Sequence, residues 1–221
     1  MVSSTDAAGG TLRSVDPVWE DIRQDAQRII ASDPAMASFV FGTVLNHARL
    51  EDAIVQRIAE RLENSVVSAE VIRRGFEDAM SEDASISEAM RIDLAAVYDR
   101  DPACSRYIEP VLYFKGFHAL QAYRLSHWMW HQGRKDFALY LQSRSSEVFQ
   151  TDINPAARIG KGIFLDHATG LVVGATAAVE DDVSILTTRS PLRINGARAK
   201  ADRAAPRVGE NGDAIREEFG L

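Results

Sequence analysis

Four polar residues of the sequence have types suited to acid–base chemistry. Asp166 and His167 are adjacent, Asp152 precedes the histidine by 15 positions, and Asp101 stands farther upstream. A histidine with an ordinary pKa of about 6.5 can take a proton from a hydroxyl group at neutral pH when a second group fixes its tautomer. Asp152 is a candidate for that second group. We therefore consider His167 as a candidate general base.

Each of these residues also has a purely structural interpretation. A histidine on a turn can simply be hydrogen-bonded or solvated. An aspartate before a proline, as in Asp101-Pro102, is typical of turns. Asp166 follows an apolar residue of a repeat, where polar residues are common. Spacing alone leaves both interpretations open.

The other histidines do not indicate a metal site. His127 and His131 are four residues apart, which is a metal-ligand spacing on a helix, but no carboxylate or cysteine completes the set, so we expect them on a helix surface or interface. His118 and His47 are expected to be packing residues. A metal-dependent enzyme built on this repeat would need about three converging histidines, and only His167 lies in the repeat.

The element that must position His167 is a hexapeptide repeat. Apolar residues recur every six positions, at Ile153, Ile159, Leu165, Leu171, Ala177 and Val183. This period is typical of a parallel β-helix, in which three hexads of about 18 residues close one coil. Gly160 and Gly174 are expected at tight corners. Adjacent coils could then bring Asp152 beside His167.

The residues before the repeat have helical periodicity from Val15 to about Gln150. Asp16-Pro17 predicts the first helix start, and Ser68 and Ser87 are predicted N-caps of later helices. A loop is expected at residues 99–102, because a residue before proline is pushed from helical torsions. A long helix is predicted from Val111 to near Gly133, and its dense aromatics indicate helix packing and a subunit interface.

The sequence therefore predicts an α + β protein with four segments. These are a flexible leader over 1–14, a helical oligomerisation domain over 15–150, a left-handed parallel β-helix of about two coils over 151–186, and an irregular, disordered tail over 187–221. The formal net charge of −7 and pI of about 5.3 argue against nucleic acid as a partner. Cys104 is the single cysteine, and no apolar run approaches the length of a membrane span. We expect a cytoplasmic protein.

Three motifs resemble bacterial serine O-acetyltransferase. They are residues 113–124 (YFKGFHALQAYR), 149–157 (FQTDINPAA) and 165–170 (LDHATG), within a resemblance that covers about 15–186. The resemblance implies transfer of the acetyl group from acetyl-CoA to the L-serine hydroxyl in cysteine biosynthesis. It implies that His167 is the general base, that Asp152 is its dyad partner, and that Asp101 and Asp166 hold the substrate serine.

The resemblance also implies the partners. Acetyl-CoA would be a co-substrate, no cofactor would be bound permanently, and no metal would be required. The family forms trimers of β-helices, usually paired into hexamers through the helical domain. A complex with O-acetylserine sulfhydrylase would use a C-terminal tail that this sequence lacks in recognisable form.

The sequence departs from the family after Leu186. Family members continue with a Gly-Gly-Thr-Gly-Lys loop that contacts acetyl-CoA and with an Arg-His pair whose arginine clamps the substrate carboxylate. Here the hexad positions hold Arg189, Asn195, Ala201 and Arg207, and no histidine follows His167. This pattern indicates a truncated or frameshifted C-terminal part or a degenerate copy. We expect impaired activity, or alternatively a non-catalytic oligomerising remnant, and the residues that bind the acetyl donor remain unassigned.

Overall fold

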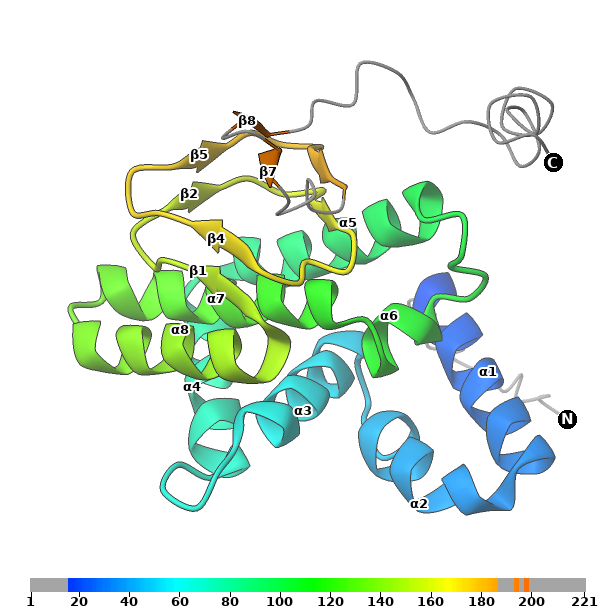
Figure 1. The fold of residues 1–221 in the computed structure, drawn as a ribbon. Helices are drawn as coiled ribbons and strands as arrows, with labels where there is room; N and C mark the ends of the chain where they lie inside the picture. The colour runs from blue at the N-terminus through cyan, green and yellow to red at the C-terminus, as the bar shows by residue number, and fades with distance from the viewer. Residues whose placement is uncertain (1–15, 187–192, 195–196, 199–221) are drawn as a thin grey trace, which may run out of the picture. The chain divides into compact units, whose positions relative to one another are not determined.

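A computed structural model of the chain describes residues 16–186 and the backbone of residues 193–194 and 197–198. The described residues 16–186 form one compact unit. Within it, helices precede short parallel strands, and the coil of strands lies over helices α7 and α8 (Figure 1). The predicted combination of a helical domain and a parallel β-helix is confirmed.

The first helices form a corner near the N-terminus of the described chain. Helix α1 (Pro17–Ser32) begins after Asp16, whose carboxylate accepts a hydrogen bond from Trp19 N at 3.1 Å. A 3₁₀ turn η1 (Pro34–Met36), helix α2 (Ala37–Val40) and a π-helical turn η2 (Phe41–Leu45) follow. Arg23 Nη1 donates to the carbonyl of His47 at 3.0 Å, which ties this corner back to α1.

Helices α3 (Leu50–Leu62), α4 (Ala69–Glu82) and α5 (Ala84–Arg100) come next. Ser68 is the N-cap residue of α4 as predicted, whereas the predicted N-cap Ser87 is wrong. Helix α5 starts three residues before Ser87, because Asp83 accepts a hydrogen bond from Ser85 N at 2.9 Å. Ser68 precedes α4 without capping it through its side chain, and the Glu63 carboxylate accepts from Ala69 N instead.

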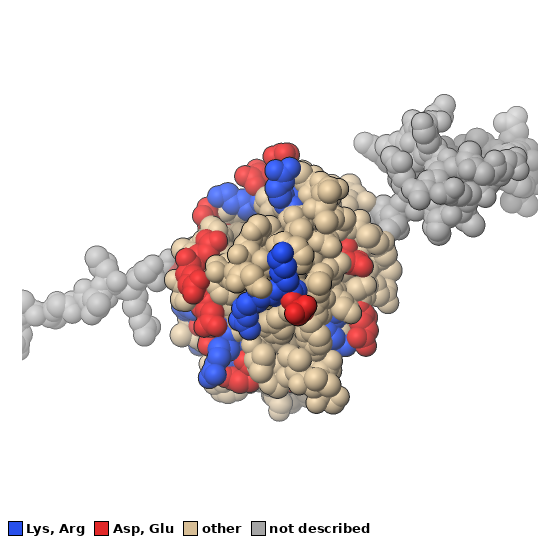
Figure 2. Space-filling view, turned by 90° about the vertical axis from the view of Figure 1, so that its left-hand side faces the viewer, with Lys and Arg blue, Asp and Glu red and all other residues tan. Residues whose placement is uncertain are grey.

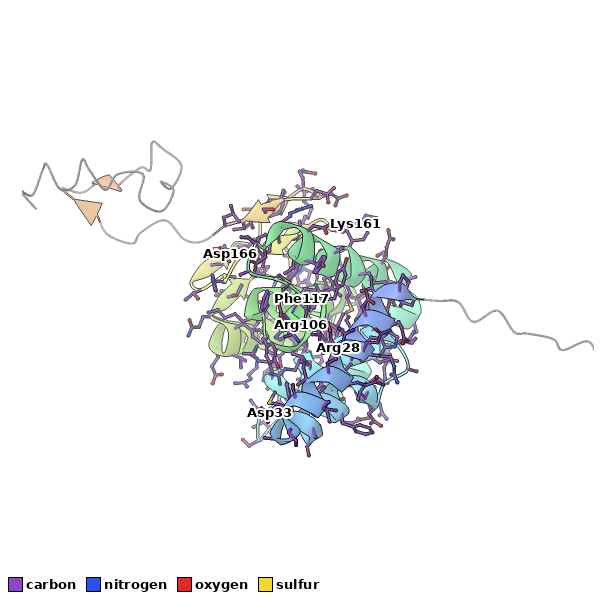
Figure 3. The ribbon with its side chains drawn as sticks, turned by 90° about the vertical axis from the view of Figure 1, so that its right-hand side faces the viewer. Arg28, Asp33, Arg106, Phe117, Lys161 and Asp166 are labelled. Carbon is purple, nitrogen blue, oxygen red and sulfur yellow. The ribbon has the colours of Figure 1, made fainter. Side chains whose placement is uncertain are left out.

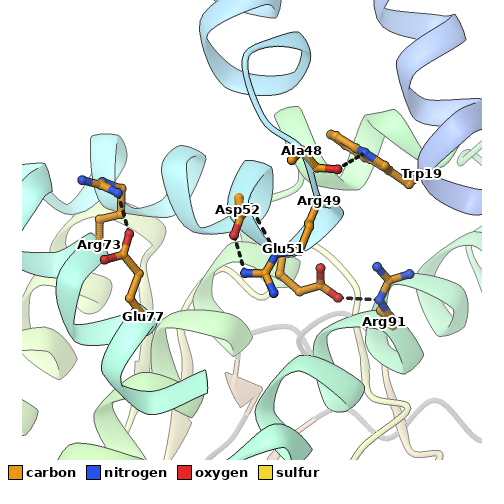
Figure 4. Close-up of polar contacts among 8 residues, drawn as sticks. All are labelled: Trp19, Ala48, Arg49, Glu51, Asp52, Arg73, Glu77 and Arg91. Atoms are coloured by element: carbon orange, nitrogen blue, oxygen red, sulfur yellow. Dashed lines mark hydrogen bonds and ion pairs between the residues drawn. The ribbon is translucent and has the colours of Figure 1, made fainter. Parts of the chain in front are cut away.

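Ion pairs connect neighbouring turns and helices in this region (Figure 4). Arg49 pairs with Asp52 at 2.7 Å on one turn of α3. Arg91 pairs with both Glu51 and Asp16 and so joins α5 to α3 and to the start of α1. The indole of Trp19 donates to the carbonyl of Ala48 at 3.0 Å, which adds a neutral link between α1 and the chain before α3.

The predicted long helix from Val111 to Gly133 is two helices. Helix α6 (Ile108–Leu112) ends before Phe114, whose extended backbone (φ −81°, ψ 108°) precedes helix α7 (Lys115–His131). Gly133, with a φ of 77°, then turns the chain into helix α8 (Lys135–Phe149), which packs against α7. The break at 113–114 lies directly before the residues that contact the coil.

The coil consists of six short strands that pair in parallel. They are β1 (Thr151–Ile153), β2 (Arg158–Ile159), β3 (Phe164–Leu165), β4 (Leu171–Val173), β5 (Ala178–Val179) and β6 (Ser184–Ile185). Strand β1 pairs with β4, β2 with β5 and β3 with β6, so each strand lies beside its equivalent in the next coil. Outside this unit, β7 (Arg193–Ile194) and β8 (Ala197–Arg198) pair with each other in antiparallel orientation.

The register of the coil differs from the predicted six-residue repeat. Ile153, Ile159 and Leu165 pair with Val173, Val179 and Ile185, which are all 20 positions later. Val173, the successor of Leu165, follows it by eight positions instead of six, because two additional residues occupy the corner that contains His167. The predicted repeat positions Leu171, Ala177 and Val183 therefore lie two residues before Val173, Val179 and Ile185, which are the observed equivalents in the second coil.

The two glycines expected at tight corners, Gly160 and Gly174, directly follow strands β2 and β4. A Cβ on Gly160 would stand 2.2 Å from Asp181 Oδ1 and 2.7 Å from Asp181 N, so a side chain would push the second coil away. At Gly174 a Cβ would meet nothing within 4 Å. Gly174 nevertheless lies at the predicted corner, because Ala177 N donates to its carbonyl at 3.0 Å, but this corner leaves room for a side chain.

Helix α7 contributes to both hydrophobic cores of the unit. Its Phe117, Leu125 and Met129 are buried among the helices, whereas Leu120 and Tyr123 are buried with coil residues such as Ile153 and Ile163. Tyr123 Oη donates to the carbonyl of Ala157 at 2.7 Å, and burial raises the pKa of this tyrosine to about 12. No helix among the described residues is long and apolar enough to cross a bilayer.

Candidate active site

Three of the four predicted site residues line one hollow of about 670 Å³. Asp101 comes from the end of α5, and Asp166 and His167 directly follow β3. The hollow is completed by Arg61, Ala103, Arg106, Glu109, Tyr113, Phe114, Lys115, Gly116, Phe164 and Leu165. A carboxylate from the helical region thus shares a hollow with a carboxylate and an imidazole from the coil.

His167 lies in a corner with unusual backbone torsions. The φ values of His167, Ala168 and Gly170 are 51°, 53° and 75°, and the left-handed region is unfavourable for the first two residues. Neighbouring groups hold the corner. Thr151 Oγ1 donates to the carbonyl of Ala168 at 3.0 Å, and Lys115 Nζ donates to Thr169 Oγ1. The two additional residues of the first coil thus form a fixed projection that carries the imidazole.

The His167 side chain is 78% exposed. Its Nε2 lies 3.7 Å from Asp166 Oδ1, which is too long for a hydrogen bond. Asp166 is 26% exposed, and its backbone N–H donates to the carbonyl of Ile185 at 3.0 Å. The imidazole is therefore accessible to a substrate from the hollow.

Asp152 does not line this hollow. It lies on β1, where it pairs with Val172, and its Oδ1 accepts a hydrogen bond from Gln142 Nε2 of α8 at 2.6 Å. It borders a separate shallow hollow together with Leu139 and Gln142. The expected coil of about 18 residues is wrong, because the first coil has 20, so the 15-residue spacing does not by itself bring Asp152 beside His167.

Asp101 occupies the turn that its sequence context predicts. It is the C-cap residue of α5, and its Oδ1 accepts a hydrogen bond from Ala103 N at 2.9 Å. The turn interpretation and the binding interpretation are compatible, because a carboxylate has two oxygens and this hydrogen bond uses one of them.

Gly116 permits the close approach of helix α7 to the coil. A Cβ at this position would stand 2.2 Å from the carbonyl oxygen of Leu165 and 3.2 Å from its Cβ. Leu165 directly precedes Asp166 and His167, so this contact fixes the distance between α7 and the corner. Sequence reasoning missed this role. A glycine in the first turn of a buried helix was the available signal.

We expect Gly116→Ala to lower the free energy of unfolding by about 1–3 kcal/mol, because α7 and β3 must separate to admit the methyl group. Urea denaturation followed by circular dichroism measures this change. Gly42→Ala is the matched control, since a Cβ there meets nothing within 4 Å. Equal unfolding free energies for the two variants would contradict the packing role of Gly116.

A buried ion pair joins the helices to the coil. Asp93 of α5 is fully buried, and its carboxylate accepts hydrogen bonds from Arg124 Nε at 2.8 Å, Gln121 Nε2 at 2.9 Å and Ile163 N at 3.0 Å. Arg124 Nη2 lies 2.6 Å from Asp93 Oδ2 and also donates to the carbonyl of Gly160. Burial raises the pKa of Asp93, and the charge of Arg124 opposes that shift.

Sequence reasoning did not identify this pair. Asp93 lies among Met90, Leu94 and Val97, which are all buried, and a carboxylate within an apolar helix face was the available signal. The pair matters to the site because Ile163 and Gly160 flank the turn that leads into β3.

The remaining histidines have structural partners. His118 is fully buried, as expected of a packing residue, and lies between Arg61 Nη1 at 2.9 Å and the carbonyl of Val111 at 2.8 Å. Burial lowers its pKa to about 3, so it is neutral and accepts from Arg61. His127 and His131 contact each other, and His127 Nδ1 lies 2.7 Å from the carbonyl of Pro155. The described residues contain no group of three side chains that could hold a metal ion.

A helical domain packed on a parallel coil, with an exposed histidine at the coil corner, defines the class of hexapeptide-repeat proteins with an N-terminal helical domain. A family model described as serine acetyltransferase, N-terminal, matches residues 18–122. The serine acetyltransferase of Haemophilus influenzae is 42% identical over 193 residues, which cover 87% of this chain and 71% of that protein. This chain belongs to the serine acetyltransferase family.

Other relatives agree with this assignment. Serine acetyltransferase of Escherichia coli K12 is 47% identical over 169 residues, or 76% of this chain and 62% of that protein. A crystal structure of the Brucella abortus serine acetyltransferase in complex with coenzyme A has 57% identity and a TM-score of 0.76, covering 77% of this chain and 68% of that one. Soybean serine acetyltransferase complexed with serine has 45% identity and a TM-score of 0.74, covering 76% and 70%.

Proposed function

We propose that this chain transfers an acetyl group from acetyl-CoA to the hydroxyl of L-serine. The observation that carries the proposal is the single hollow in which Asp101, Asp166 and His167 meet from separate segments. Relatives solved with coenzyme A and with serine support the two substrates. We further propose the cytoplasm as the compartment, which the single thiol, Cys104, supports.

In the proposed reaction, His167 removes the proton from the serine hydroxyl as the oxygen attacks the thioester carbonyl carbon. The carbon–sulfur bond then breaks, and the imidazolium returns its proton to the departing CoA thiolate. The products are O-acetylserine and CoA. Asp101 and Asp166 would pair with the serine ammonium group, which orients the hydroxyl toward the base.

Within one chain, Asp152 is not placed to act as the dyad partner of His167. Its carboxylate is engaged by Gln142 and borders a different hollow. Val172, beside it, is 72% exposed, and Leu139 of the same hollow is 43% exposed. We propose that this apolar surface is covered when coils associate into the trimer that the family resemblance implies, and that Asp152 then orients the imidazole.

The divergent sequence after Leu186 supports a lower rate than that of the family's enzymes. Residues 187–221 contain neither the Gly-Gly-Thr-Gly-Lys loop nor the Arg-His pair. The same observation favours the alternative of a non-catalytic oligomerising remnant. The expected disorder of this segment concerns residues that lie mainly outside the described part of the chain. The same is true of the C-terminal tail that a sulfhydrylase complex would use.

A thiol-reactive assay of CoA release in the presence of acetyl-CoA and L-serine separates these functions. Release that depends on L-serine and exceeds the hydrolysis of acetyl-CoA alone is the expected result for the acetyltransferase. If analytical ultracentrifugation shows an oligomer and the assay shows no serine-dependent CoA release, the result would contradict the acetyltransferase and support the non-catalytic remnant.

Substitution of Asp101 in the hollow offers a direct test of substrate binding. We expect Asp101→Asn to weaken L-serine binding by about 10- to 100-fold, because a charge-assisted contact to the ammonium is lost while an amide oxygen can still accept from Ala103 N. Isothermal titration calorimetry measures the affinity. Asp33→Asn is the matched control, since Asp33 accepts from Ala35 N in the same way and lies far from Asp166 (Figure 3). Unchanged serine affinity in Asp101→Asn would refute the assignment.

A further inference from the structure

Three cations line the hollow that contains Asp101, Asp166 and His167. They are Arg61, Arg106 and Lys115. An amino-acid substrate carries an ammonium group, which suits the two aspartates, and a carboxylate, which requires a cation or several N–H donors. The family's carboxylate clamp has no counterpart in residues 187–221, so one of these three cations is the available partner.

Two of the cations are engaged elsewhere. Arg61 Nη1 donates to His118 Nδ1 at 2.9 Å, and its guanidinium lies 4.6 Å from the centre of the Phe149 ring. Moving Arg61 toward a ligand would leave the buried His118 without its donor. Lys115 Nζ donates to Thr169 Oγ1 and so holds the corner that carries His167.

Arg106 is positioned differently. Its Nε donates to Glu109 Oε1 at 2.9 Å, while neither of its terminal nitrogens makes a hydrogen bond to a side chain in residues 16–186. Glu109 also accepts from Ser105 N at 2.9 Å and Ser105 Oγ at 3.1 Å. The carboxylate is thereby held in place, and its hydrogen bond with Nε orients the guanidinium of Arg106, whose side chain is 40% exposed. A guanidinium held through Nε, with both terminal nitrogens available, suits bidentate binding of a carboxylate.

The loop after α5 brings Arg106 into the surroundings of Asp101. Burial raises the pKa of the Cys104 thiol to about 11, and the charges of Glu109, Asp101 and Arg106 also act on this thiol. These charges are therefore grouped around one short segment. Arg106 and Asp166, both labelled in Figure 3, line the same hollow.

We propose that Arg106 binds the α-carboxylate of L-serine, while Asp101, five residues earlier, binds its ammonium group. The inference rests on the proposed function and assigns a residue that distinguishes amino acids from amines. A ligand that has the ammonium and hydroxyl groups but no carboxylate gains nothing from Arg106. Ethanolamine is such a ligand.

The test is isothermal titration calorimetry of the full chain with L-serine and with ethanolamine. We expect Arg106→Met to weaken L-serine binding by about 10- to 100-fold and to change ethanolamine binding by less than about twofold. Methionine retains an apolar side chain that can pack in the same space. Arg28→Met is the matched control, because Arg28 pairs with Asp25 at the same i,i+3 spacing on α1 and does not line the hollow.

The outcomes separate this inference from the function on which it rests. L-serine binding by Arg106→Met at the affinity of the unchanged chain would overturn the role of Arg106 and leave the function intact. Equal weakening of L-serine and ethanolamine would also overturn it, because the loss would not concern the carboxylate. Failure of the unchanged chain to bind L-serine would overturn both. Circular dichroism and thermal midpoints establish that the variants are folded.

Discussion

Replacement of His167 by alanine is expected to lower serine-dependent CoA release by about 10²- to 10⁴-fold, the usual contribution of a general base. The folded state should change little, because the imidazole is 78% exposed and alanine, which is not β-branched, can adopt a φ of 51° at a modest cost. The measurement is the initial rate of CoA release at saturating acetyl-CoA and L-serine, corrected for hydrolysis.

The control for this variant is His131→Ala, which removes an exposed histidine of α7 that lies outside the hollow. Its rate should match that of the unchanged chain. Serine-dependent release that persists in His167→Ala would show that another group accepts the proton. Thermal midpoints of both variants should agree with that of the unchanged chain, so that a lost rate reflects chemistry and not unfolding.

The largest loss of stability is expected from Asp93→Ala, at about 3–5 kcal/mol. The substitution leaves the Arg124 charge buried without its partner and deprives Gln121 Nε2 and Ile163 N of an acceptor. Since domains of this kind are stable by only about 5–15 kcal/mol, the denaturation midpoint should fall strongly. Urea denaturation at neutral pH followed by tryptophan fluorescence measures it.

Two further variants test the cause of this loss. Glu77→Ala breaks the ion pair with Arg73 on the surface of α4, where both side chains are at least one-third exposed, and should cost less than about 1 kcal/mol (Figure 4). The double variant Asp93→Leu/Arg124→Leu removes both buried charges and should recover part of the stability lost by Asp93→Ala. Equal losses for Asp93→Ala and Glu77→Ala would contradict the proposed role of the buried pair.

The described face that carries the α7–α8 connection shows acidic and basic side chains side by side, with uncharged surface between them (Figure 2). The charges that matter to the site are instead the few that line the hollow, where Asp101 and Asp166 stand with Arg61, Arg106 and Lys115.

The sequence by itself determined the order of the elements. Helical periodicity with Asp16-Pro17 at its start predicted helices, and apolar residues at six-residue spacing predicted a parallel coil, because these periodicities record which side chains each local geometry buries. The adjacency of Asp166 and His167 at a corner also followed from the sequence. The three family motifs added Asp101 to the same hypothesis, and the structure places it in the same hollow.

Only the tertiary structure decided how the site is assembled. The two additional residues at His167 shift the second coil by two positions, and this is visible only when strands pair across 20 residues. The links between Asp93 and Arg124 and between Gly116 and Leu165 join segments more than 30 residues apart. The reason is physical: a local pattern shows that a face is buried, whereas the partner of a charge, the space beside a glycine and the surroundings of Asp152 depend on packing between distant segments.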